Sequence, residues 1–111
     1  MVSVEEAFRR LTIGDPTFIA AIANRDREDL RTPRLDDRTE ALLRIGALIA
    51  VDASPSSFRG AVEAARRSGA RLEDLLAVLL TVGADVGTAR VIAAAPRIAL
   101  AAGYDVEAAL E

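Results

Sequence analysis

The sequence of 111 residues predicts an all-α protein, a bundle of about six helices. Three observations lead to this fold class. Apolar residues recur at spacings of three and four along most of the chain, as on one face of an α-helix. Helix start and stop signals divide the chain into segments of helical length. No stretch alternates between apolar and polar residues over a strand length, and no internal repeat stands out.

Two short helices are expected near the beginning of the chain. Ser3 opens a capping-box pattern, and the helix that follows ends at Gly14. An Asp-Pro pair at Asp15 begins the second helix, which runs to about Asn24. Residues 25–34 are charged and nearly devoid of apolar side chains, which is typical of an exposed connector.

The remaining residues predict the helical core. An apolar helix begins near Asp36 and ends near Asp52, and its wide apolar arc indicates a central helix covered on more than one side. Ser54, followed by a proline, is the expected N-cap of the next helix, which ends before Gly69. We therefore divide a single domain into an N-terminal helical segment with its connector, residues 1–34, and a core, residues 35–111.

The last helices of the core are the most apolar. Acidic residues open the helix that follows Arg71, and its leucines and valines leave so little polar surface that we expect it to be buried. Gly83 and Gly87 mark its end. An Ala-rich helix comes next, and Pro96 is expected to kink or divide it. A glycine closes this helix, and a short final turn is expected at residues 105–110.

Three missing residue types restrict the chemistry. The chain contains no Cys, no His and no Lys, and all fourteen of its basic residues are Arg. Thiolate nucleophiles, disulfides, imidazole bases, the usual Cys and His metal sites and Schiff bases are thereby excluded. We expect no metal and no cofactor, and acid–base chemistry would have to come from carboxylates or from Tyr104.

Charge and hydropathy suggest the partners. The net charge is −3 with both signs interspersed, and only 4% of residues are aromatic, so nucleic acid is not an expected partner. Half of the residues are hydrophobic and the mean hydropathy is positive, which favours apolar surface buried between subunits and hence a homo-oligomer. No apolar run is long enough to span a bilayer and no signal-peptide pattern is present, so we expect a cytoplasmic protein.

The order of several short motifs resembles the carboxymuconolactone decarboxylase family, which includes the alkylhydroperoxidase D-like proteins. The resemblance covers about residues 35–103 and implies an all-α fold of about six helices that assembles into trimers, hexamers or other rings. The segments that carry it are Leu35-Asp36-Asp37-Arg38-Thr39, Ser54-Pro55, Ala61-Val62-Glu63-Ala64-Ala65, Ser68-Gly69-Ala70, Leu72-Glu73-Asp74-Leu75-Leu76 and Asp85-Val86-Gly87.

The chain departs from the family at the positions that carry its chemistry. By resemblance, the Cys-x-x-Cys pair of the peroxidase branch falls on Ser54 and Ser57, the His of both branches on Ala61, and the acid on Ala41. Glu40 is adjacent, but one step along a helix turns a side chain by about 100°, so it does not simply replace that acid. Serine cannot undergo disulfide cycling and alanine cannot transfer a proton, so thiol peroxidase activity is expected to be absent.

Three functions are consistent with these observations. We favour an oligomeric, non-catalytic or small-ligand-binding family member, a pseudoenzyme in which Ala41 and Ala61 enlarge an apolar pocket and Ser54, Ser57 or Arg59 orients a small organic ligand. The two serines can equally be an N-cap and a first-turn hydroxyl, and Arg59 can belong to a surface charge ladder with neighbouring residues of its helix.

The second function is a lyase or isomerase acting on a small carboxylated substrate through relocated acids and an Arg. The candidates are Asp85, Glu40, Asp52 and Arg90. Asp85 stands out because an unpaired charge at the end of the most apolar helix would be costly, although a salt bridge to Arg90 or Arg44 would also explain it. The third function is a structural assembly module that uses the Ala-rich stretch at residues 91–102 as a contact surface.

Overall fold

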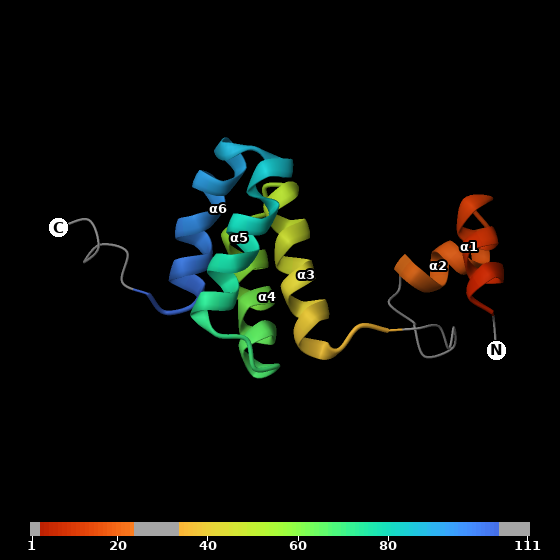
Figure 1. The fold of residues 1–111 in the computed structure, drawn as a ribbon, viewed down its shortest axis with the longest axis horizontal. Helices are drawn as coiled ribbons and strands as arrows, with labels where there is room; N and C mark the ends of the chain where they lie inside the picture. Colours follow the sequence, from red (N-terminus) through yellow and green to blue (C-terminus); the bar gives the residue numbers. More distant parts are fainter. Residues whose placement is uncertain (1–2, 24–33, 105–111) are drawn as a thin grey trace. The chain divides into compact units, whose positions relative to one another are not determined.

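The computed structural model describes residues 3–23 and 34–104, and this part of the chain forms six α-helices and no strand (Figure 1). The prediction of an all-α fold is confirmed. The chain divides into two compact units, Met1–Arg34 and Leu35–Glu111, and each is described by itself. The final turn predicted at residues 105–110 lies outside the described residues.

The first unit contains α1 (Val4–Thr12) and α2 (Pro16–Ala23). As expected, Ser3 caps α1, its Oγ accepting a hydrogen bond from the Glu6 amide at 3.1 Å. The Asp15 carboxylate caps α2 by accepting a bond from the Phe18 amide at 3.0 Å. Between the helices Gly14 has φ +67°, a left-handed conformation that glycine adopts without strain.

The second unit begins with α3 (Asp37–Ala50) and α4 (Pro55–Arg67). The Asp36 carboxylate accepts a hydrogen bond from the Thr39 amide at 2.9 Å and caps α3. Ser54 caps α4, and Pro55 occupies its first turn, where the missing proline N–H leaves no bond unmade. These start signals lie within one residue of the predicted positions.

The helix α5 (Leu72–Val86) differs from the sequence prediction in two respects. Gly83 lies inside the helix, where a Cβ atom would meet the Val91 side chain at 3.4 Å, and only Gly87, at φ +91°, ends it. The expectation that the whole helix is buried is wrong for the single chain. Leu75 and Leu79 are buried, whereas Leu76 and Leu80 are 54% and 71% exposed, because the neighbouring helices cover only one side of α5.

Pro96 was expected to kink or divide the last helix, and it does not divide it, because α6 (Thr88–Ala101) runs through Pro96 without a break. Pro96 removes one backbone donor, normally bonded to the carbonyl four residues earlier. Both Pro96 and Ile92 lie on the exposed side of α6, where water can satisfy that carbonyl. The helix therefore tolerates the proline at this position.

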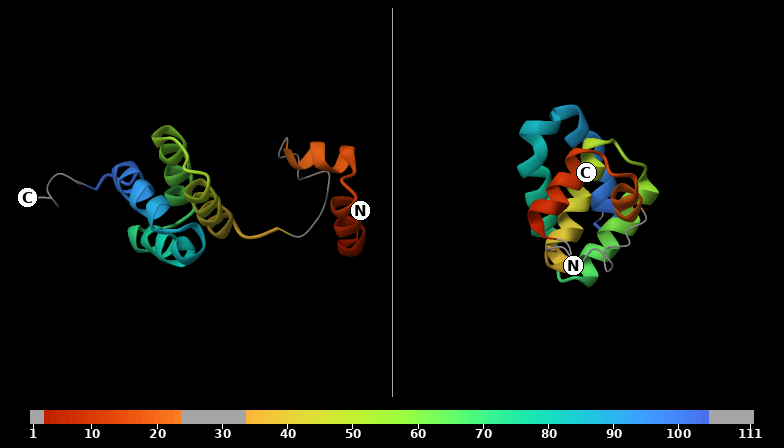
Figure 2. Two further views of the ribbon diagram at one scale, coloured as in Figure 1. Left: turned by 90° about the horizontal axis from the view of Figure 1, so that it is seen from above. Right: turned by 90° about the vertical axis from the view of Figure 1, so that its right-hand side faces the viewer.

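The four helices of the second unit alternate in direction (Figure 1). Helix α3 packs against α4 and α5, and α6 packs against the same two helices from the other side, with a smaller contact between α3 and α6. Helices α4 and α5 lie across the bundle from each other (Figure 2). Consequently the α3–α5 pair and the α4–α6 pair form two opposite sides of the bundle.

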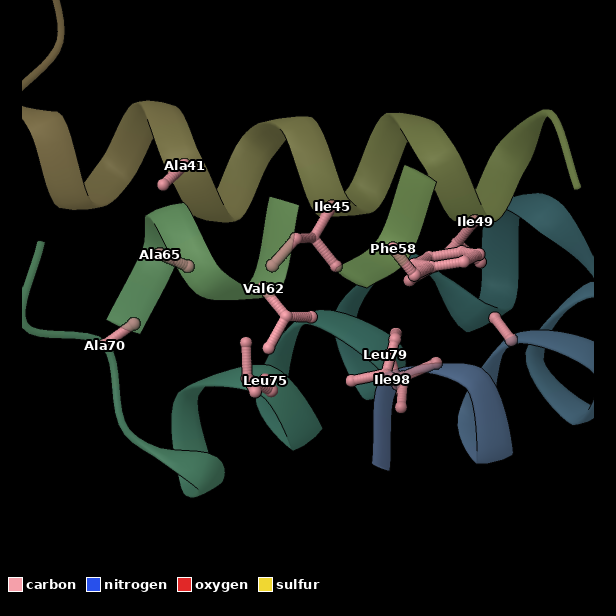
Figure 3. Packing of buried hydrophobic residues seen from close by; sticks show 11 residues of the cluster. Ala41, Ile45, Ile49, Phe58, Val62, Ala65, Ala70, Leu75, Leu79 and Ile98 are labelled. Carbon is pink, nitrogen blue, oxygen red and sulfur yellow. The ribbon is translucent and has the colours of Figure 1, made fainter. Parts of the chain in front are cut away.

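A single hydrophobic core lies between these helices (Figure 3). Phe58 of α4 is fully buried and is the largest side chain in the core. The rest of the cluster comes from all four helices and from Ala70 in the loop between α4 and α5; the helical members are Ala41, Ile45, Ile49, Val62, Ala65, Leu75, Leu79, Ala94 and Ile98. The core is built from small and medium-sized side chains around one aromatic ring. No neighbouring side chain is large enough to fill the space of that ring if it is removed.

The substitution Phe58→Ala should lower the free energy of unfolding by about 3–5 kcal/mol, since it removes buried apolar surface and leaves a cavity. Urea denaturation of the full chain followed by circular dichroism at 222 nm measures this loss. Phe8→Ala is the matched control because Phe8 is 66% exposed on α1, and it should change the free energy by less than about 0.5 kcal/mol. Equal losses in the two variants would contradict the assignment of Phe58 to the core.

Candidate functional site

The start of α4 brings together the two serines that the family resemblance singled out. The Oγ atoms of Ser54 and Ser57 lie 3.1 Å apart, and the Ser57 amide donates a hydrogen bond to Ser54 Oγ at 3.3 Å. A second hydroxyl, that of Ser56, also lies 3.1 Å from Ser54 Oγ. All three serines are exposed. The cluster has the geometry of an N-cap with neighbouring first-turn hydroxyls.

The two alanines at the other family positions lie against the core. Ala41 is 6% exposed and belongs to the buried cluster, and Ala61 is half-buried and packs against that cluster. Glu40 is 8% exposed on α3. None of these three residues lines any of the pockets described below.

The candidate acids occupy different environments. Asp85 is exposed on α5. Its charge therefore carries no desolvation cost, the cost that made Asp85 a candidate in the sequence. The ion pair expected between Asp85 and Arg90 or Arg44 is not formed among the described residues. Instead Arg90 Nη1 lies 3.5 Å from the carboxylate of Asp52.

Asp52 also contacts Arg97, a residue that sequence reasoning missed. Arg97 Nη1 donates to Asp52 Oδ1 at 3.1 Å and to the Ala53 carbonyl at 2.7 Å, linking α6 to the loop between α3 and α4. Asp52 adopts φ +53°, a left-handed conformation that Asp tolerates better than most residues. The seven-residue separation of Arg90 and Arg97 places both on one face of α6, and that spacing could have identified the pair.

Three surface pockets are associated with these elements. A groove of about 310 Å³ runs between α3 and α5, and we call it the α3–α5 groove; it is lined by Thr39, Leu42, Leu43, Gly46, Asp74, Ala77, Val78, Thr81 and Val82. A pocket of about 350 Å³ lies between α4 and α6, and we call it the α4–α6 pocket; it is lined by Pro55, Arg59, Pro96, Arg97, Leu100 and Ala101. A shallower hollow of about 600 Å³ continues along α4, lined by Arg59, Glu63, Arg66, Arg67, Ala101, Ala102 and Gly103.

The α3–α5 groove is mostly apolar, with Thr39 and Asp74 at one end and Thr81 toward the other. A Cβ atom on Gly46 would meet Val82 at 3.4 Å, so the two helices approach closely there. At the other end Arg38 Nη2 lies 2.7 Å from Asp74 Oδ1, and the Arg71 amide donates to Asp74 Oδ2 at 2.8 Å. The bond from Arg38, followed by the one from the Arg71 backbone, holds the pKa of Asp74 below its usual value.

No protein-family model, curated protein or solved structure matches this chain. Within residues 3–23 and 34–104, no helix is long and apolar enough to cross a bilayer. The same residues contain no group of three or more carboxylates that could hold a metal ion. The features of the described residues that could form a functional site are the three pockets and the ion pairs around Asp52.

Asp74 should make stability depend on pH. A carboxylate whose pKa is lowered by folding stabilises the protein above its unfolded-state pKa, about 4, and this contribution is lost as the pH falls through the folded-state value. Asp74→Asn should therefore lower the free energy of unfolding at pH 7, and the difference from the wild type should shrink as the pH falls below about 4. Urea titrations across this pH range measure the difference.

The neighbouring substitution Glu73→Gln is the control for this measurement. Glu73 is paired with Arg71 at 3.0 Å, but its side chain is 66% exposed, and such surface pairs contribute little. If the free energy of unfolding depended on pH equally in the two variants, the bond from Arg38 would not be what lowers the pKa of Asp74.

Proposed function

We propose that this chain is a carboxymuconolactone decarboxylase-like protein that acts as a non-catalytic homo-oligomer. The observation that carries the proposal is the unpartnered apolar side of the bundle formed by α3 and α5. Leu43 is 64% exposed at the α3–α5 groove, and most of the other residues that line the groove are apolar, namely Leu42, Ala77, Val78 and Val82. Apolar surface of this kind marks an interaction site in a soluble protein.

The residues at the family's chemical positions support the non-catalytic part of the proposal. Ser54 acts as an N-cap, and the buried Ala41 and half-buried Ala61 contribute to core packing. None of these side chains offers a thiolate, an imidazole or an acid. The alternative lyase or isomerase function has less support, because Asp85 is exposed, lines none of the pockets described and forms no ion pair with Arg90, which pairs with Asp52 instead.

The partner that fits this side of the bundle best is a second copy of the chain. In the α3–α5 groove the helices run in the same direction, with Arg38 near one end and Asp85 near the end of α5 (Figure 1). A two-fold axis would align the two sides antiparallel, so that Asp85 of each copy approaches Arg38 of the other. The apolar centres would then meet, and at each end the Arg38 guanidinium, which already bonds Asp74 of its own chain at 2.7 Å, would face a second carboxylate. A two-fold contact builds a dimer and, by repetition around a three-fold axis, a hexamer.

Sedimentation analysis and light scattering of the purified full chain test the assembly. The wild type should contain an even number of subunits, and Leu43→Glu should shift it toward smaller species, because a carboxylate would be buried in an apolar contact. Ile92→Glu is the matched control, since Ile92 is 66% exposed on α6, outside the α3–α5 groove, and it should leave the subunit number unchanged. A monomeric wild type would contradict the proposed assembly, and a trimer would contradict the two-fold contact.

Thiol-dependent hydroperoxide turnover should be absent from the wild-type protein, because Ser54 and Ser57 cannot form a disulfide. Peroxide consumption coupled to a dithiol reductant measures this activity, and clear turnover would contradict the non-catalytic proposal. The double variant Ser54→Cys/Ser57→Cys is informative as a control. The two hydroxyls already lie 3.1 Å apart, so mild oxidation should remove both titratable thiols through an intramolecular disulfide.

A further inference from the structure

The α4–α6 pocket combines apolar walls with arginine side chains. Pro55, Pro96, Leu100 and Ala101 supply the apolar part of the lining, and Arg59 and Arg97 supply the charge. Its volume of about 350 Å³ lies at the lower end of the range found for small-molecule sites. The pocket is thus suited to a small molecule with an apolar body.

Charge is distributed unevenly over the bundle. Helices α4 and α6 together carry five Arg and one acid, Glu63, whereas α5 carries three acids and no basic residue. Asp52, in the loop before α4, pairs with two of these arginines, so positive charge still predominates over negative charge on this side. The whole chain has a net charge of −3. The side formed by α4 and α6 is therefore electropositive on an acidic protein, and it favours an anionic ligand.

The two arginines of the α4–α6 pocket differ in their bonding. Arg59 makes no hydrogen bond or ion pair within the described residues, and Glu63, four residues along α4, pairs with Arg67 at 3.3 Å instead. Arg97 donates hydrogen bonds through Nη1 to Asp52 and to the Ala53 carbonyl. These bonds hold its half-buried side chain at the wall of the α4–α6 pocket. Arg59 thus offers a free guanidinium, and Arg97 offers a fixed one.

We propose that the α4–α6 pocket binds a small organic anion, an aromatic or branched carboxylate, with the carboxylate on Arg59 and the apolar body against Pro55, Pro96 and Leu100. A planar guanidinium binds a carboxylate through two parallel hydrogen bonds. Arg97 lies at the same pocket, where its ion pair with Asp52 neutralises part of its charge and holds its guanidinium in place. Arg59 points away from the helix face that carries Ser57 and Ala61, since two residues along a helix correspond to about 200°.

Of the residues that the family resemblance singled out, only Arg59 lines this pocket, and the site does not depend on the proposed assembly. It lies on the side of the bundle opposite the α3–α5 groove. Loss of self-association in Leu43→Glu would leave this proposal intact, and loss of anion binding would leave the proposed assembly intact.

Benzoate is the probe for the test, because it joins a carboxylate to an apolar ring of suitable size. Ligand-observed saturation-transfer NMR on the full chain, titrated with benzoate, measures the dissociation constant. We expect saturable binding to the wild type and a loss of about tenfold or more in Arg59→Gln, the usual effect of removing a charge-assisted hydrogen bond. Arg67→Gln, the same change on the same helix outside the pocket, should stay within about twofold of the wild type.

Two further ligands test the chemistry of the site. Benzyl alcohol, which lacks the charge, should show no saturable binding, and inorganic phosphate, which lacks the apolar body, should displace benzoate poorly. The proposal is overturned if benzoate does not saturate, if Arg59→Gln binds as tightly as Arg67→Gln, or if phosphate competes as well as benzoate itself. Circular dichroism spectra identical to that of the wild type are required of both variants, and the exposure of both arginines makes this outcome the expected one.

Discussion

The packing of one aromatic ring constrains the whole second unit. Phe58 is the largest side chain in the core, and α3, α5 and α6 all contribute side chains to the cluster around it. Its position follows from the start of α4, because the Ser54 cap and Pro55 fix where that helix begins and hence which face carries the ring inward. The arginine of the α4–α6 pocket, one residue later, is turned outward for the same reason.

Local signals in the sequence predicted much of the fold. The caps at Ser3 and Ser54 and the glycines after α1 and α4 lie where the pattern placed them, because capping bonds and left-handed turns depend on residues that are neighbours in sequence. Pro96 does not divide α6, because it lies on a side of the helix that faces water, and the local sequence pattern does not specify which side is exposed.

The candidate site was less predictable, because its geometry depends on contacts between distant residues. The ion pairs of Asp52 join it to side chains 38 and 45 positions further along the chain. Hydrophobic periodicity shows which face of a helix is apolar but not which helix covers it, so the exposure of Leu80 could not be anticipated from the composition of α5. Arg59 was selected by resemblance, whereas the pocket beside it is a property of how α4 packs on α6.

The order of the helices in the bundle affects how the second unit folds and how ligand binding is coupled to its stability. Helices α3 and α4 form one hairpin and α5 and α6 another, each held by contacts between successive elements, which form quickly. The α3–α5 groove and the α4–α6 pocket both lie along the junctions where one hairpin meets the other. Any molecule that occupies either junction binds only the docked arrangement, so it stabilises the tertiary fold by mass action. Amide hydrogen exchange in the four helices would then slow as more of the binding sites are occupied. Binding on one side of the bundle is thereby coupled to binding on the other side, since both depend on the same folding equilibrium.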